Sequence, residues 1–459
     1  EICDFRDLMG KRRRKEGECG AGDADGGGAA GEWGLNAATV PVLQAAPDLG
    51  LVALALGPVV RVWSEVGASA VSLPLPEEAA LAHTAPVRSV AFDRAGRLMA
   101  TGGDDKLVKL WDVATWRCIR TLRDTKKVTA VVFTADGSHV CFSNRFGDVS
   151  VAPATAEEEA SQSSASLLLG HCCSIVTSMA ASSDGTLVVT GDRDEKVRVS
   201  RLPSDPSLLA GGAHEIASFC LGHDMFVTAV ATVSAPELEG GVAVLSASGD
   251  GTVRLWCAAT GEQLASLAVG GGGAGAAAAG RADDDEEEGA TVLEASGVVA
   301  LAVSPCGGLA ACVLEGEAGV VHVLRFSAKT RELAEAQALT PAPVAGLPLV
   351  ALAFGAGGAL WAAAGGANSD GGERWLAVAL AKPDAGGGAP AALVACAEGA
   401  EAEVALRGED APRPSGGEAG TAVLGMLRKR IYDPADGHAQ RKAMRRHERH
   451  KAATASNEN

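Results

Sequence analysis

Histidine, aspartate and hydroxyl residues recur at matched positions in three segments, a combination that can serve either catalysis or buried hydrogen bonding. Segments 101–111 (TGGDDKLVKLW), 190–200 (TGDRDEKVRVS) and 246–256 (SASGDGTVRLW) align without gaps. Each begins with Ser or Thr, has Asp at its fifth position, and lies downstream of a histidine. A hydroxyl beside a His–Asp pair can act as a nucleophile. The same three groups can instead satisfy one another's hydrogen bonds inside a fold.

The elements that carry these residues are predicted to be β-strands joined by tight turns. Aliphatic residues alternate at the eighth and tenth positions of each segment, which is the pattern of a strand with one buried face. A buried aspartate is costly unless it is hydrogen-bonded, and histidine and hydroxyl donors supply those bonds. The three sets therefore indicate structural residues rather than catalytic ones.

Weaker copies of the same strand pattern occupy the rest of the chain. They are found at 58–64, 147–153, 319–326 and 373–380, and with the three strong copies they make seven outer-strand candidates. Residues 33–380 without their low-complexity inserts amount to roughly 311 residues, which is about seven repeats of 40–45. The sequence therefore predicts an all-β fold built from about seven copies of one repeat.

These residues resemble WD repeats, in which His, Ser or Thr, Asp and Trp form a hydrogen-bonded tetrad within one blade. The resemblance implies a seven-bladed WD-repeat β-propeller. Its matching sets are two complete tetrads and one that has Ser200 in place of tryptophan: His83, Thr101, Asp105 and Trp111; His223, Ser246, Asp250 and Trp256; and His171, Thr190 and Asp194.

Composition divides the chain into four parts. We predict a disordered, basic and Gly-rich segment at 1–32 and the propeller at 33–380, with low-complexity loops at 153–166 and 268–290. An Ala/Gly/Pro-rich linker at 381–420 and a basic, partly helical tail at 421–459 follow. The net charge of -17 argues against a protein that coats nucleic acid. The basic block at 11–15 favours a nuclear protein, although solvated tails without a partner explain the basic ends as well.

Several other kinds of site are not supported. None of the eleven cysteines forms a C-x-x-C pair, so they are read as core residues in a reducing compartment and no metal site is expected. The G-x-G-x-x-G match at 270–275 lies in a Gly/Ala run without a strand-to-helix context. The apolar stretch at 344–364 is interrupted by proline and glycine, which favours two buried strands around a turn over a membrane span.

A narrower resemblance rests on three runs: 191–200 (GDRDEKVRVS), 218–230 (SFCLGHDMFVTAV) and 245–256 (LSASGDGTVRLW). Together they are similar to the non-catalytic WD-repeat subunit of tRNA (guanine-N7)-methyltransferase, over about 65 residues. The step Tyr432-Asp433 and the basic run after it resemble the end of that family, although Pro434 and Gly437 replace more helical residues.

The resemblance implies a heterodimer in which a separate subunit binds S-adenosylmethionine and methylates a variable-loop guanosine of tRNA. This chain would bind no cofactor, stabilise that subunit and help to position the tRNA. The partner-binding candidates are Arg193, Lys196 and Arg198, with an ordinary solvated turn as the alternative. Weaker candidates for tRNA binding lie in the tail: Arg441, Lys442, Arg445, Arg446 and Arg449.

Two rival functions remain open. One is a WD-repeat scaffold or a ubiquitin-ligase substrate receptor, and such receptors usually carry W-D-x-R/K at a blade end. Segment 111–114 (WDVA) has Ala at the basic position, and Trp256 is followed by Cys257. An enzyme is the third possibility, but every His–Asp–Ser/Thr grouping is accounted for by a tetrad.

Overall fold

The structure is a computed structural model, and a defined part of the chain is described by it. The described residues are 41–65, 70–155, 165–171, 174–203, 209, 211–212, 215–270, 296–305, 307–341, 344–367, 373–383, 393–395 and 404–406. The segments predicted at 1–32 and 421–459 lie outside them, as do most of the loops predicted at 153–166 and 268–290. The described residues belong to one compact unit.

The described strands form six four-stranded antiparallel sheets and one five-stranded sheet. The first sheet contains β1 (Val42–Ala46), β2 (Leu51–Leu56), β3 (Val59–Ser64) and β4 (Ala70–Leu73). The second contains β5 (Val87–Phe92), β6 (Leu98–Gly103), β7 (Leu107–Asp112) and β8 (Cys118–Arg123). The third contains β9 (Val128–Phe133), β10 (His139–Asn144), β11 (Asp148–Pro153) and β12 (Ser166–Gly170).

The remaining sheets repeat this order. The fourth contains β13 (Val176–Ala181), β14 (Leu187–Asp192), β15 (Val197–Arg201) and β16 (Ile216–Cys220). The fifth contains β17 (Val227–Ser234), β18 (Val242–Ser248), β19 (Thr252–Cys257) and β20 (Gln263–Ala268). The sixth contains β21 (Val298–Val303), β22 (Leu309–Leu314), β23 (Val321–Ser327) and β24 (Glu332–Leu339). The seventh contains β25 (Leu349–Phe354), β26 (Leu360–Ala367), β27 (Glu373–Pro383), β28 (Leu393–Ala395) and β29 (Val404–Leu406).

The helices of the described residues are short 3-10 turns in loops: η1 (Pro47–Leu49), η2 (Pro76–Leu81), η4 (Glu239–Gly241) and η6 (Ala356–Gly358). No helix in this part of the chain has the length and apolar character needed to cross a membrane. The fold is an all-β WD40 propeller, as the sequence predicted.

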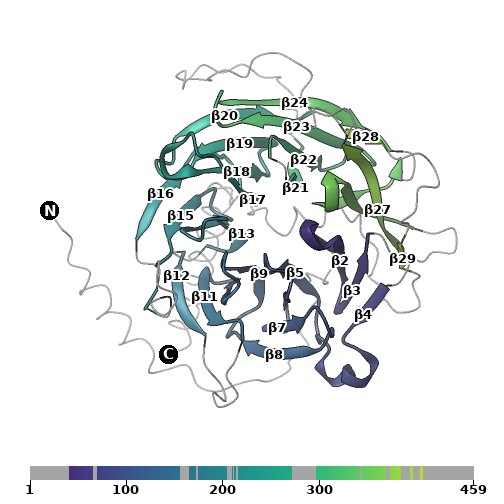
Figure 1. Ribbon diagram of the computed structural model, residues 1–459. Helices are drawn as coiled ribbons and strands as arrows, with labels where there is room; N and C mark the ends of the chain where they lie inside the picture. Colours follow the sequence, from purple (N-terminus) through teal and green to yellow (C-terminus); the bar gives the residue numbers. More distant parts are fainter. Residues whose placement is uncertain are drawn as a thin grey trace, which may run out of the picture. The chain divides into compact units, whose positions relative to one another are not determined.

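The sheets follow one another around a ring (Figure 1). The first strand of each sheet contacts the first strand of the next, and β25 contacts β1. These innermost strands line a central channel of about 620 Å³. Strands β3, β11, β23 and β27 match the four weaker sequence copies, and each is the third strand of its sheet rather than the outermost one.

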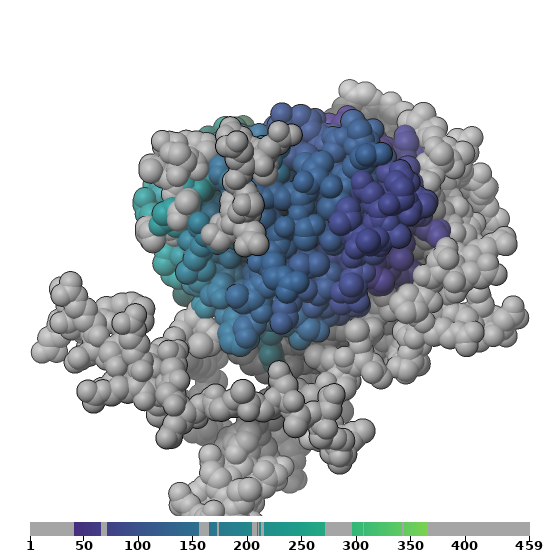
Figure 2. Space-filling model, turned by 90° about the horizontal axis from the view of Figure 1, so that it is seen from below, coloured from purple at the N-terminus to yellow at the C-terminus, as the bar shows by residue number. Residues whose placement is uncertain are grey.

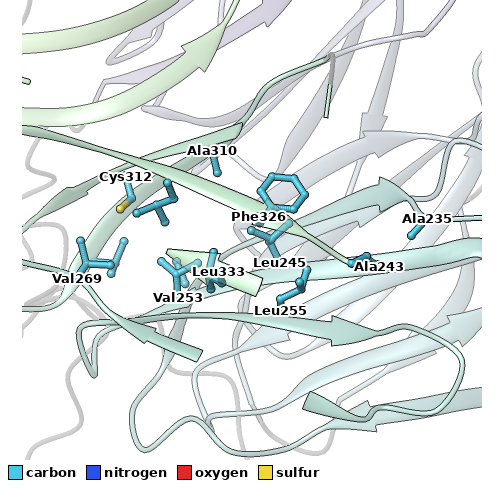
Figure 3. Packing of buried hydrophobic residues seen from close by; sticks show 14 of the residues in the cluster. Ala235, Ala243, Leu245, Val253, Leu255, Val269, Ala310, Cys312, Phe326 and Leu333 are labelled. Atoms are coloured by element: carbon cyan, nitrogen blue, oxygen red, sulfur yellow. The ribbon is translucent and has the colours of Figure 1, made fainter. Parts of the chain in front are cut away.

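The hydrophobic core lies between neighbouring sheets. The cluster between the fifth and sixth sheets includes Leu245 and Leu255 from one side and Cys312 and Phe326 from the other (Figure 3). Alternation in the strands produces this arrangement, since β14 and β15 both send valine side chains into the interface with the fifth sheet. Each interface in the ring has a cluster of this kind.

Two predictions about the end of the chain are now tested in part. The two buried strands predicted around a glycine turn at 344–364 are confirmed as β25 and β26, with η6 between them. The prediction of a linker at 381–420 is wrong in part, because β27 extends to Pro383 and the strands β28 and β29 pair with it. Short runs such as Leu393–Ala395 add strands to the edge of β27 although they lack a long alternating pattern.

The first and last sheets meet without sharing a strand. Trp63 and Trp361 pack edge to face with ring centroids 5.9 Å apart, within the cluster that joins the two sheets. Both carboxylate oxygens of Glu65 accept a hydrogen bond from the backbone N–H of Ala356, at 2.9 and 3.0 Å. Side-chain contacts therefore close the ring at this seam.

Candidate functional site

The first predicted tetrad is assembled in the second sheet. The Nδ1 atom of His83 lies 2.8 Å from Asp105 Oδ2, and its Nε2 atom lies 2.8 Å from Thr101 Oγ1. Trp111 donates from Nε1 to the same hydroxyl at 3.0 Å. The structure therefore brings these four side chains together within one blade.

The fifth sheet repeats this arrangement. His223 bridges Asp250 at 2.9 Å and Ser246 at 2.7 Å, and Trp256 donates to the Ser246 hydroxyl at 2.8 Å. Burial alone would raise the pKa of Asp250. The hydrogen bonds from His223 and Thr252 outweigh burial and lower the pKa of this carboxyl group.

The hydrogen-bond pattern explains why these sets are not nucleophilic centres. Because an ionised aspartate can only accept, His83 donates from Nδ1 and accepts at Nε2, so the Thr101 hydroxyl donates to the imidazole. This polarity is that of a catalytic hydroxyl, but Thr101 is fully buried and its oxygen also accepts from Trp111. No space is left beside the oxygen for a substrate carbonyl.

The third set differs from the prediction in one residue. His171 contacts Thr190 at 2.7 Å, but its Nδ1 atom lies 2.9 Å from Asp192 rather than from Asp194. The assignment of Asp194 to this tetrad was therefore wrong. Asp192 ends β14, so its carboxylate already points toward the histidine, whereas Asp194 lies in the turn that follows.

Asp192 also fixes the conformation of that turn. Its Oδ1 atom accepts from the backbone N–H groups of Asp194 and Lys196, at 2.8 and 3.0 Å. Burial would raise the pKa of Asp192, but the hydrogen bonds from His171 and these backbone groups lower it. Glu195 adopts a left-handed conformation with a φ of 72°, which completes the reversal.

The turn, residues 192–196, presents both of the leading docking candidates on the surface. Lys196 is exposed and Arg193 is partly exposed, while the backbone N–H of Arg193 donates to Ile175 at 2.9 Å. The turn is thus tied to its own strands and to the segment that enters the sheet. It holds a compact group of two bases and three acids, of which Asp192 is buried.

Arg198 lies along the blade rather than projecting from it. Its guanidinium donates from Nε to Ser200 Oγ at 2.9 Å and to the carbonyl of Gly170 at 3.0 Å. Burial lowers its pKa. Ser200 stands where the sets in the second and fifth sheets have tryptophan, and its hydroxyl accepts from Arg198. Its role in docking stays a prediction.

A further buried network was not predicted. In the sixth sheet both ring nitrogens of His322 lie 2.7 Å from carboxylates, Nδ1 from Glu335 and Nε2 from Glu317. Burial would lower the pKa of His322, but the hydrogen bonds and charges of the two glutamates raise it. The single histidine in 319–326 was the only sequence signal.

The predicted tRNA-binding residues Arg441, Lys442, Arg445, Arg446 and Arg449 lie outside the described residues.

Comparison with known proteins points to one family for the central region. Residues 151–340 match the family described as tRNA methyltransferase TRM82 WD40 domain, and residues 78–112 match the WD domain, G-beta repeat. Among solved structures, a chain of the Crystal Structure of Mitotic Checkpoint Complex is similar with a TM-score of 0.53 at 18% identity. That similarity covers 78% of this chain and 97% of the other, and it supports the propeller fold alone.

Three curated relatives carry the same name, tRNA (guanine-N(7)-)-methyltransferase non-catalytic subunit WDR4. The mouse protein is 37% identical over 174 residues and the human protein 35% identical over 173 residues. The Dictyostelium discoideum protein is 30% identical over 189 residues. In each case the match covers 38% of this chain and 38% of the relative.

The resemblance drawn from the runs at 191–200, 218–230 and 245–256 is confirmed by these matches, because all three runs lie within 151–340. The turn at 192–196 and two of the three His–Asp pairs lie in the same region. Residues 151–340, less than half of the chain, are thus similar to the WD40 domain of the tRNA methyltransferase TRM82 family.

Proposed function

We propose that the chain is the non-catalytic subunit of a tRNA (guanine-N7)-methyltransferase complex. It docks beside a catalytic subunit that carries S-adenosylmethionine, stabilises that subunit and helps to position tRNA for methylation of a variable-loop guanosine. The observation that carries the proposal is the rigid turn at 192–196, which lies inside the region similar to the named subunits.

The turn is suited to docking because its shape is set before any partner arrives. Asp192 holds two backbone groups of the turn and a buried histidine at the same time. A surface that is already ordered loses little conformational entropy on binding. Charges at fixed positions select the register of a partner with complementary charges. Arg193 and Lys196 would face acidic side chains of the catalytic subunit.

Pairing is tested by co-expression of the full chain with the catalytic subunit and affinity purification of the complex. The double variant Arg193→Glu, Lys196→Glu is expected to weaken pairing by at least about 2 kcal/mol, which is roughly 30-fold in Kd. A matched control reverses two exposed bases of the sixth sheet, Lys329→Glu and Arg331→Glu, and should pair normally. Unchanged pairing of the Arg193/Lys196 variant, with an unchanged circular-dichroism spectrum, would remove the turn from the interface.

Mass spectrometry of proteins captured by the full chain separates this function from its rival. Recovery of the methyltransferase subunit supports the proposal, whereas recovery of ubiquitin-ligase components without it supports a substrate receptor. Methyl transfer by the purified chain alone would contradict a non-catalytic role.

Three finer points belong to the same proposal. Each of the sheets is one blade, so the ring has seven blades, which an experimental density map of the purified chain would count. The tail with Arg441, Lys442, Arg445, Arg446 and Arg449 contacts tRNA phosphates, and removing residues 428–451 should weaken tRNA binding. The basic block at 11–15 directs the protein to the nucleus, which a fluorescent fusion with this block replaced by alanine would test.

A further inference from the structure

The second sheet carries a concentration of positive charge that contrasts with the acidic chain around it. Residues 84–127 contain ten Lys and Arg but only five Asp, whereas the whole chain has a net charge of -17. The excess is not explained by the tetrad, which uses one histidine and one aspartate of this sheet.

The acids of this sheet are already engaged within the fold. Asp104 pairs with Arg88 at 2.9 Å and with Lys127 at 3.1 Å, and Asp105 pairs with His83. The other three accept hydrogen bonds in turns: Asp93 from Leu98, Asp112 from Thr115 and Asp124 from Lys126. Of the bases that face solvent, Arg97 forms an ion pair with Asp93 at 3.7 Å. The acids therefore neutralise few of the bases that face solvent.

The exposed bases border one strand, β8, which is the outermost strand of the sheet. They run from one end of β8 to the other and form a group that we term the basic edge: Arg97, Lys106, Arg117, Arg123 and Lys126. Arg123 is the last residue of β8. The carbonyl of Lys106 accepts from Asp124 at 2.8 Å, so the turn that carries Lys106 lies beside that end of β8.

At the opposite end of β8 the carbonyl of Arg117 accepts from the backbone N–H of Asp112. The carbonyl of Arg97 accepts from the backbone N–H of Val113, which follows Asp112, so Arg97 and Arg117 lie near the same end of the strand. Between the ends, Arg120 is partly buried and donates to the carbonyl of Pro153 in the third sheet. At about 3.3 Å per residue, the strand alone separates Arg117 from Arg123 by roughly 20 Å. Figure 2 looks onto this side of the ring, where the residues of the second and third sheets appear in blue.

The outermost strands of the other sheets lack this charge. Within its own bounds β8 contains Arg120 and Arg123, whereas strands β4, β12, β16, β20 and β28 contain no Lys or Arg, and β24 carries Glu332 and Glu335 instead. One alternative is that the charged residues of an edge strand have a single role, which is to prevent pairing with another sheet. If that were their purpose here, the comparably exposed edges would need them too.

We propose that the basic edge binds the phosphate backbone of RNA. Arginine and lysine spaced along an extended strip match a polyanion with regularly repeated charges, and phosphate contacts require no particular base sequence. The inference rests on the proposed function for the identity of that RNA, a tRNA held against the propeller while the catalytic subunit acts on it. The basic edge would grip the tRNA backbone from a sheet outside the family-matched region at 151–340.

The test measures binding of a fluorescein-labelled tRNA to the full chain, alone and paired with the catalytic subunit, by anisotropy across a series of salt concentrations. The test variant is Lys106→Gln, Arg117→Gln, Arg123→Gln. The control variant removes the same charge from the sixth sheet, where Arg325, Lys329 and Arg331 are also exposed, each as the Gln substitution. Both variants retain the basic tail, so its contribution is constant.

Loss of three phosphate contacts is expected to reduce the slope of log Kd against log salt concentration by about 2 to 3. At about 0.1 M salt the affinity should fall by roughly tenfold to 100-fold, with the control close to the unmodified chain. An equal loss in both variants, or an unchanged slope in the test variant, would overturn the inference. So would intact tRNA binding with lost pairing, because the surface would then bind protein. Pairing is scored separately by co-purification, so a failure of the proposed function is distinguishable from a failure of RNA binding.

Discussion

Asp192 is the residue at which the hydrogen-bonded set of the fourth sheet departs from those of the second and fifth sheets. It replaces the aspartate two positions later by accepting from His171 on one oxygen and from two backbone groups on the other. We predict that Asp192→Asn lowers the free energy of unfolding by about 2 to 3 kcal/mol, because the amide cannot accept on both sides. Asp194→Asn should change it by less than about 1 kcal/mol. Urea denaturation of both variants checks this, and an equal or larger cost for the Asp194 variant would contradict it.

The same residue shows how far the site could be predicted from sequence. Gapless alignment placed Thr101, Ser246 and their aspartates correctly, because the turn has the same length in those two copies. It failed at Asp194, since a side chain from the end of β14 reaches the histidine first and the sequence gives no measure of that reach. The network around His322 depends on Glu335 from the next strand, a pairing that only the register of β23 and β24 establishes.

His322 gives the protein a pH-dependent contribution of the opposite sign from a carboxylate. Both ring nitrogens face glutamates, so the folded state favours the doubly protonated imidazolium and the pKa is raised. A histidine whose pKa is higher in the folded protein than in the unfolded chain stabilises the fold at pH values below the pKa of the unfolded chain, about 6.5. This contribution is lost as the pH rises through the pKa of the folded protein. We predict that His322→Gln reduces the melting temperature more at pH 6 than at pH 9. Calorimetry at both pH values tests this, and an equal reduction would contradict it.

At the scale of the element, the strands and their order were more predictable than the ends of the domain. Alternating aliphatic residues identified β7, β15 and β19, and a glycine cluster separated β25 from β26. The strands β28 and β29 are three residues each in an Ala/Gly-rich stretch, too short for a period of two to be visible. The contact that closes the ring was also invisible, because Glu65 and Ala356 are 291 residues apart.

The seam between the first and last sheets can be tested by a pair of substitutions. A Cβ atom at Gly355 would lie 1.8 Å from Glu65 Oε1, so Gly355→Ala should displace the carboxylate from Ala356. The φ of Gly355 is -95°, so alanine itself fits the backbone. We predict that Gly355→Ala and Glu65→Ala each lower the free energy of unfolding by about 1 to 3 kcal/mol.

The double variant supplies the control for this prediction. With Glu65 already replaced by alanine, the added methyl group at position 355 meets no carboxylate, so its additional cost should be below about 1 kcal/mol. Additive losses in the double-mutant cycle would show that Gly355 is needed for a reason other than the space taken by Glu65.

At the scale of the whole molecule, the ring divides its tasks between buried and exposed charge. The cores between neighbouring sheets and the tetrads within sheets hold the blades in place. The exposed charges then differ from sheet to sheet: the turn at 192–196, which we propose as the docking site, is in the fourth sheet, and the basic edge is in the second. A repeated scaffold of this kind allows separate surfaces to bind a protein and an RNA without a change of fold.

The buried aspartates make the ring sensitive to acid as a whole. The pKa values of Asp105, Asp192 and Asp250 are lowered because hydrogen bonds from histidine and from the turns outweigh the effect of burial. An aspartate whose pKa is lower in the folded protein than in the unfolded chain stabilises the fold. This contribution is complete at pH values above the pKa of the unfolded chain, about 3.9, and is lost as the pH falls through the pKa of the folded protein. These residues lie in three different sheets, so protonation weakens the ring at three places at once.

We predict that the urea midpoint of unfolding falls steeply below about pH 4. Asp250→Asn, which removes one titrating group, should have a lower midpoint at pH 7 but a shallower fall below pH 4. Parallel curves for the two proteins in the acid range would show that Asp250 does not link folding to protonation.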